Sequence, residues 1–121
     1  MLMFQKRGLK TKNLLDQIYE QKAKRYKMAR VVAKQLTDIL VEKYHVKKVI
    51  LIGSCLKEEV FHLYSDIDLC VERLPKNLYF QVVGELMMEA GEFEVDIIPV
   101  EEATERMRKY IKKGDIFYER G

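Results

Sequence analysis

Three aspartates occupy positions where strand-forming residues are expected. Asp66 and Asp68 alternate with aliphatic residues, and Asp96 lies in a later run of aliphatic residues. Because successive side chains of a strand point to opposite faces, Asp66 and Asp68 are expected to project from the same face. Aspartate is a poor strand former, so its repeated use here calls for a functional reason. The pattern predicts that the three carboxylates bind a divalent metal, Mg2+ or Mn2+, which prefer carboxylate oxygens.

A glycine-serine pair precedes the first two aspartates. The apolar run 49–52 ends at Gly53-Ser54, and Lys57 follows three residues later. Glycine lets the backbone approach a phosphate closely, serine adds a hydroxyl donor, and lysine neutralises phosphate charge. Together with the carboxylates, this predicts two-metal phosphoryl transfer from a nucleoside triphosphate. Asp96 is the candidate for drawing the proton from the attacking hydroxyl.

Each of these signals is weak when taken alone. An Asp-x-Asp is more often a solvated strand end than a metal site, and a lone Gly-Ser is weaker still. Cys55 and Cys70 lack the spacing of zinc ligands, so we expect no zinc site and a reducing, cytoplasmic location. His45 and His62 have no partner spacing and are expected to be ordinary surface or core residues.

The composition is that of one globular domain spanning residues 1–121. Apolar residues make up 48% of the chain and charged residues 34%. Uninterrupted apolar runs are far shorter than the ~20 residues needed to cross a bilayer, so no membrane span is expected. The first residues place apolar side chains before basic ones, which makes a poor signal peptide.

The charge is distributed unevenly along the chain. Residues 1–48 hold 13 Lys/Arg and 4 Asp/Glu, a balance of +9, whereas residues 49–121 hold 9 and 15, a balance of −6. The basic half suits an anionic partner, and residues 1–12 are expected to contribute to its binding; the alternative is that these charges merely solvate a helix face. We divide the domain into a basic extension, residues 1–25, and a core, residues 26–121.

Periodicity predicts both helices and strands along the chain, as in an α/β (α+β) protein. Asn13 is the expected N-cap of a helix reaching about residue 44, and the polar stretch 21–25 leaves open one helix or two. Pro75 and Gly91 bound a second helix. The remaining expected elements are strands 48–52, 66–72 and 93–98, a helical turn within 55–64, a helix 101–113 and an edge strand 116–119.

The combined motifs resemble a known family. Gly53-Ser54, Ser65-Asp66-Ile67-Asp68-Leu69, Asp96 and the closing stretch 111–119 are similar to the signature of minimal nucleotidyltransferases (MNT) of the DNA polymerase β-like superfamily. The resemblance covers residues 30–119. It implies a polymerase β-like nucleotidyltransferase fold, a short mixed β-sheet backed by helices, here with an N-terminal helical extension. It also implies that Asp66 and Asp68 are metal ligands, Asp96 is the third catalytic carboxylate, and Gly53 and Ser54 contact the triphosphate.

The resemblance also implies a donor and a partner. Members often pair with a small helical HEPN protein in toxin-antitoxin modules and attach AMP from ATP to that partner. This chain departs from the usual pattern after Gly53-Ser54, because Glu58 stands where the family has a glycine, while Lys57 keeps the positive charge. The leading hypothesis is an Mg2+-dependent nucleotidyltransferase acting on a protein or RNA hydroxyl. The alternatives are a non-catalytic module that neutralises a partner and a nucleic-acid binder; the oligomeric state stays open.

Overall fold

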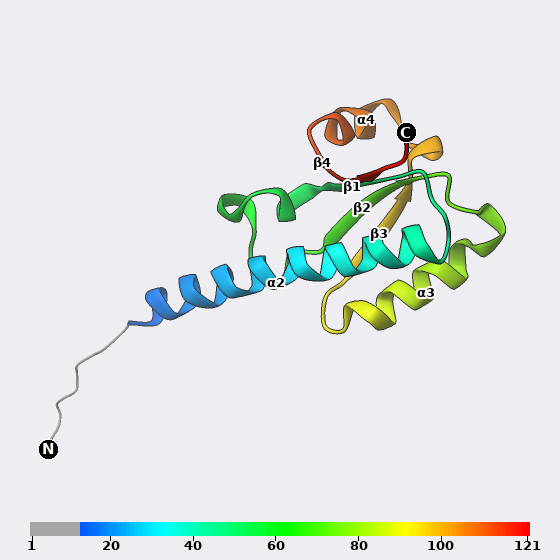
Figure 1. Ribbon diagram of the computed structural model, residues 1–121. Helices are drawn as coiled ribbons and strands as arrows, with labels where there is room; N and C mark the ends of the chain where they lie inside the picture. Colours follow the sequence, from blue (N-terminus) through cyan, green and yellow to red (C-terminus); the bar gives the residue numbers. More distant parts are fainter. Residues whose placement is uncertain (1–12) are drawn as a thin grey trace, which may run out of the picture.

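The computed structural model describes residues 13–121, in which a four-stranded sheet lies between two layers of helices. The long helix α2 (Leu14–Glu42) and the shorter α3 (Tyr79–Ala90) cover one face, and α4 (Glu105–Lys112) covers the other (Figure 1). This arrangement confirms the predicted α+β architecture with a sheet backed by helices.

The sheet is mixed, with the strand order β3-β2-β1-β4. Its strands are β1 (Lys48–Ile52), β2 (Ile67–Glu72), β3 (Val95–Pro99) and β4 (Asp115–Glu119). β1 is antiparallel to both of its neighbours, whereas β2 and β3 are parallel. Parallel neighbours need a crossover connection, which α3 provides. The predicted edge strand at the end of the chain is present as β4.

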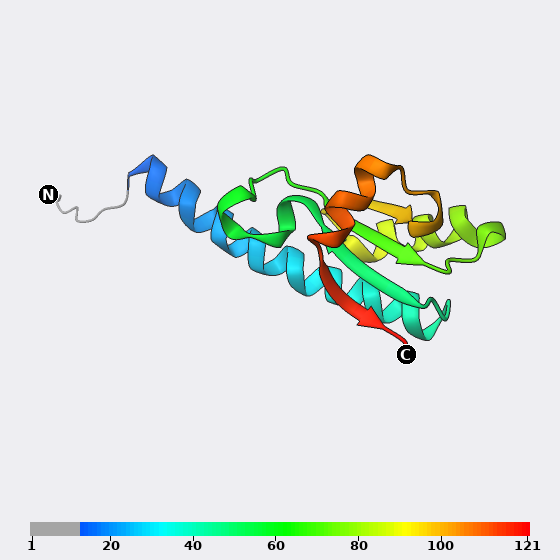
Figure 2. The same ribbon diagram turned by 90° about the horizontal axis from the view of Figure 1, so that it is seen from above.

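Helix α2 is one continuous helix, which settles the choice left open by the polar stretch 21–25. The Asn13 side chain accepts a hydrogen bond from the Asp16 backbone N–H (2.8 Å), as expected of an N-cap. The first buried residue of α2 is Ala29, and its earlier turns extend beyond the sheet (Figure 2). The predicted division between residues 25 and 26 falls inside this helix, and residues 1–12, with the partner-binding role predicted for them, lie outside the described part. No described helix combines the length and apolar character needed to cross a membrane.

Successive side chains of each strand point to opposite faces of the sheet, so a separate hydrophobic cluster is buried on each face. The larger cluster lies between the sheet and helices α2 and α3, and it includes Leu36, Leu40, Leu51, Leu69 and Leu86. The smaller cluster consists of Ile50, Ile52 and Cys70, with Met107 and Ile111 of α4 packed against it. The second face is therefore covered only in part, which leaves room for polar side chains at one end.

Several boundaries differ from the predicted ones. The last helix begins at Glu105 rather than residue 101, because the Thr104 hydroxyl accepts a hydrogen bond from the Met107 N–H (3.2 Å) and caps it there. β2 begins one residue after Asp66, and β3 begins at Val95 rather than residue 93. The link from β1 to β2, residues 53–66, is called the connector below. Its helical turns are Gly53–Leu56 and Glu58–Val60, and the second lies within the range 55–64 where a helical turn was expected.

Gly114 provides a direct test of the packing around β1. A Cβ atom added to Gly114 would lie 2.6 Å from Ile50 Cγ2 and 2.7 Å from the Leu51 carbonyl oxygen. We expect Gly114→Ala to lower the free energy of unfolding by about 1–3 kcal/mol through overpacking. Gly84→Ala is the control, since an added Cβ in α3 meets nothing within 4 Å. It should raise stability by about 0.5–1 kcal/mol. Urea unfolding of both variants measures this, and equal effects would contradict the close approach at Gly114.

Candidate active site

Three carboxylates meet at the start of the two parallel strands. The β2–β3 register places Asp68 directly beside Asp96, and Asp66 comes two residues before Asp68 on the same side of the chain. One carboxylate oxygen from each of Asp66, Asp68 and Asp96 lies within 4.8 Å of the others. We call these three residues the carboxylate cluster. It stands on the face of the sheet that α4 covers only in part.

Within the carboxylate cluster, the ionised form of Asp68 is destabilised. Asp68 is half-buried, whereas Asp66 and Asp96 are exposed. Burial, followed by repulsion from Asp96 and Asp66, raises the pKa of the Asp68 carboxyl from 3.8 to about 6. Three carboxylates this close together therefore favour the binding of a proton or a cation between them.

The donor set of the cluster fits a hard divalent cation. All three candidate ligands are carboxylate oxygens, which suit Mg2+ and Mn2+ better than the softer metals that select nitrogen and sulfur. The exposure of Asp66 and Asp96 leaves the cluster open to solvent and to a substrate. Asp66, Asp68 and Asp96 are thus the residues that would hold such a cation.

Gly53 lies against the carboxylate cluster. Its φ is +81°, and a Cβ atom at this position would lie 2.6 Å from Asp68 Oδ2, so the position requires glycine for two reasons. Ser54 is half-buried in the same helical turn. The turn follows Ile52, which pairs with Asp68 across β1 and β2. The predicted Gly53-Ser54 pair therefore borders the predicted carboxylates.

Lys57, the third residue predicted on the phosphate side, follows the turn Gly53–Leu56 as its C-cap. Its side chain is exposed, and among residues 13–121 it forms no hydrogen bond or ion pair. Lys57 is therefore free to contact a ligand, but no contact joins it to the carboxylate cluster.

Helix α2 holds the connector through side chains that the sequence did not single out. Arg30 donates from Nη1 to the Cys55 carbonyl oxygen and from Nη2 to Asp115 Oδ2, both at 2.9 Å. Tyr26 Oη donates to the Leu56 carbonyl oxygen (3.3 Å), and Arg25 Nε donates to the Leu63 carbonyl oxygen (3.1 Å). The signal available in the sequence was the presence of polar side chains on the inward face of an otherwise apolar helix stripe.

Two hydrogen bonds within the connector hold the backbone just before β2. The buried Cys55 Sγ donates to the Asp66 carbonyl oxygen at 3.2 Å. Burial, with a further contribution from the Asp68 charge, raises the pKa of the Cys55 thiol to about 11, so it keeps the proton that it donates. The buried Ser65 accepts a hydrogen bond at Oγ from the His62 backbone N–H (2.9 Å). Both contacts orient Asp66.

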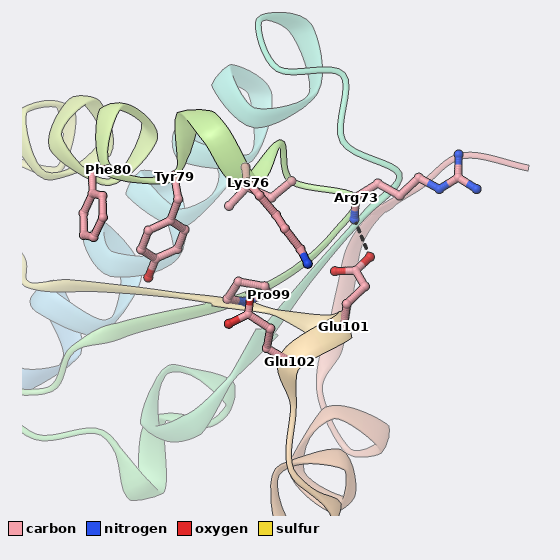
Figure 3. A pocket seen from close by; sticks show the side chains of 8 residues that line it. Arg73, Lys76, Tyr79, Phe80, Pro99, Glu101 and Glu102 are labelled. Carbon is pink, nitrogen blue, oxygen red and sulfur yellow. Dashed lines mark hydrogen bonds between the residues drawn. The ribbon is translucent and has the colours of Figure 1, made fainter.

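Two hollows flank the parallel strands. One of about 360 Å³, the Asp66 hollow, is lined by Arg25, Leu63, Tyr64, Ser65, Asp66, Glu92 and Glu94. Another of about 530 Å³ lies at the opposite, carboxyl ends of β2 and β3, between Tyr79 and Phe80 of α3 and the stretch from Pro99 to Glu102 (Figure 3). There the Arg73 N–H donates to Glu101 Oε2 (2.8 Å). The larger hollow lacks a carboxylate cluster, so we assign the chemistry to the end that carries Asp66, Asp68 and Asp96.

Comparisons with known proteins bear on the same region. The family model described as Polymerase beta, Nucleotidyltransferase matches residues 34–121. A search of curated proteins gives no match. One similar chain comes from the solved structure of the tri-AMPylated Shewanella oneidensis HEPN toxin in complex with MNT antitoxin. It shares 19% identity, with 84% of this chain and 71% of that chain covered and a TM-score of 0.47.

The raised pKa of Asp68 predicts a pH dependence of stability without metal. The folded pKa, about 6, exceeds the ordinary 3.8, so the folded chain binds the proton more tightly and its stability falls as the pH rises through this window. We expect a loss on the order of 1–3 kcal/mol in wild type that Asp68→Asn does not show. Urea unfolding in a chelator at several pH values measures the difference. Parallel pH profiles for the two proteins would contradict a raised pKa of the Asp68 carboxyl.

Proposed function

The chain belongs to the polymerase β nucleotidyltransferase family, and from this we propose that it transfers a nucleoside monophosphate to a hydroxyl group on a partner protein. The expected donor is ATP, the transferred group AMP, and the cofactor Mg2+ or Mn2+. The observation that carries the proposal is the carboxylate cluster, whose ligand oxygens lie within 4.8 Å of one another beside Gly53. In the reaction, the acceptor oxygen bonds to the α-phosphorus and pyrophosphate leaves.

Each member of the cluster has a proposed role. Asp66, Asp68 and Asp96 would hold the divalent cation, which when bound neutralises the triphosphate and lowers the pKa of the acceptor hydroxyl. Asp96 stands on the edge strand β3 with its side chain exposed, which supports its assignment as the base that takes the acceptor proton. Asp68 is half-buried between the other two and is assigned to cation binding alone.

Gly53, Ser54 and Lys57 are the proposed contacts for the triphosphate. The missing side chain at Gly53 keeps backbone and carboxylate close together, so a phosphate bound there would adjoin the cation. Ser54 contributes a hydroxyl from the same turn. Lys57 has an exposed ammonium group that no described residue neutralises, which supports a role in binding phosphate.

The proposed partner is a small helical HEPN-type protein, as in toxin-antitoxin modules. This part of the proposal is supported by the likeness of the Gly-Ser and Asp-x-Asp motifs to those of MNT proteins. The two cysteines are free and buried as thiols, which supports a reducing compartment, the cytoplasm.

A second candidate function is binding of a partner without transfer. It is favoured by the connector, where the exposed Glu58 and Glu59 follow Lys57 and place negative charge on the proposed phosphate side. Like charges near the triphosphate would weaken its binding. In this case the chain would neutralise its partner by contact alone.

Label transfer distinguishes the two functions. The purified chain, α-labelled ATP and Mg2+ are added to an extract of the source organism, and transfer to protein is measured. We expect Asp68→Asn and Asp96→Asn to lower transfer by about 10²–10⁴-fold, since each removes a cation ligand or the base. Glu72→Gln is the matched control, because Glu72 is on the same strand and faces Lys47 at 3.7 Å. It should stay within about twofold, as expected of a surface ion pair.

Calorimetric titration of ATP with Mg2+ gives a second readout. Wild type should bind ATP only when the metal is present, and Asp68→Asn should lose this binding. If wild type binds a partner but transfers no label, contact without catalysis is the function. Equal label with wild type and Asp68→Asn would remove the carboxylate cluster from the chemistry.

A further inference from the structure

The first turns of α2 expose a row of large apolar side chains. The exposed fractions are 71% for Leu14, 56% for Leu15, 38% for Ile18 and 58% for Tyr19. These four residues are called the α2 stripe. They lie where the helix extends beyond the sheet and the other helices (Figures 1 and 2). Adjacent exposed apolar groups of this kind mark interaction surfaces.

The α2 stripe continues the face that the helix buries in the core. Five turns of α-helix take about 18 residues, so residues separated by that number share one face. The residues 18 positions after the stripe are all buried: Val32, Ala33, Leu36 and Thr37. The sequence therefore carries the core-facing pattern past the end of the core. A second protein packed against the α2 stripe would bury these side chains, as the core buries the later residues on the same face of the helix.

The stripe leads toward the carboxylate cluster. Lys22, one turn after the stripe, shares a small hollow with Glu58 and Glu59 of the connector. Arg25, in the next turn, lines the Asp66 hollow together with Tyr64, whose side chain is 87% exposed. A body seated on the stripe would thus meet the connector and then the hollow that opens onto Asp66.

We infer that the α2 stripe is the docking surface for the protein that accepts the nucleotide, an inference that rests on the proposed function. The acceptor would present an apolar strip to the stripe and a hydroxyl flanked by basic side chains to the Asp66 hollow. Arg25 pairs with Glu92 in the lining of that hollow, and Asp66 and Glu94 leave it with a net negative charge, which sets this charge requirement. The stripe precedes residues 34–121, so it lies outside the part of the chain that the family model matches.

The size and chemistry of the stripe argue against other occupants. A stable interface takes ~20–30 residues a side, so four side chains pairing with their copies would not hold a dimer. A larger protein that also covers the connector meets this requirement. Nucleic acid is bound chiefly through its phosphates, which four apolar side chains do not attract.

The test compares two double variants that add the same charge to α2. Leu15→Lys/Ile18→Lys changes the stripe, and Val31→Lys/Gln35→Lys changes exposed positions on another face of the helix. Each is assayed as the full chain with α-labelled ATP and Mg2+ in an extract of the source organism. We expect the stripe variant to lose about tenfold or more of the protein label and the control variant to stay within about twofold.

Two further measurements separate docking from catalysis. The stripe side chains are exposed, so Leu15→Lys/Ile18→Lys should keep the wild-type melting temperature and Mg2+-dependent ATP binding. A photo-crosslinking residue at position 18 should join the labelled protein, and one at position 31 should not.

Each contrary outcome has a distinct meaning. Equal label from the two double variants, a crosslink to a second copy of the chain, or label that ribonuclease removes would overturn the docking surface and leave the transfer chemistry standing. Loss of ATP binding by the stripe variant would overturn it as well, by assigning the effect to the catalytic site. If wild type labels nothing, the proposed function fails, and the acceptor surface fails with it.

Discussion

Mutual repulsion among three carboxylates is the constraint on which the other features of the molecule depend. Oxygens of Asp66, Asp68 and Asp96 lie within 4.8 Å of one another, and the backbone must hold them there when no cation is present. Parallel pairing of β2 with β3 places Asp68 beside Asp96 through the backbone hydrogen bonds of the sheet. Asp66 lies outside the strand and relies on the connector, where Cys55 binds its carbonyl oxygen.

The connector in turn depends on α2. Arg30 joins the connector at Cys55 to the start of β4 at Asp115, and Tyr26 and Arg25 bind further carbonyl groups. Carbonyl groups of an irregular segment would otherwise need water as their partner. One helix therefore packs the core with its later turns, holds the connector with its middle turns, and exposes apolar side chains on its first turns.

Local rules in the sequence were enough to predict the strands and the candidate site, but not the contacts between them. The alternation around Asp66, Asp68 and Asp96 and the turn at Gly53 depend on neighbouring residues only. The pairing of Arg30 with Asp115 joins residues far apart in the chain, so no local pattern reveals it. The spacing of Leu14 and Ile18 predicts a helix correctly but gives no measure of where the core ends. The Thr104 cap was missed because the acidic residues before it also suit a first helical turn.

The continuity of α2 constrains how the chain can change its length. From Leu14 to Glu42 the helix has no break. Its first turns and the residues that bind the connector therefore keep a fixed angle to one another about the helix axis. Inserting a single residue between Tyr19 and Arg25 would turn the first part about 100° around the axis relative to the rest. Insertions or deletions of whole turns, about seven or eleven residues, would leave the two faces aligned. We therefore expect related chains to differ in length between these two parts of α2 by about seven or eleven residues.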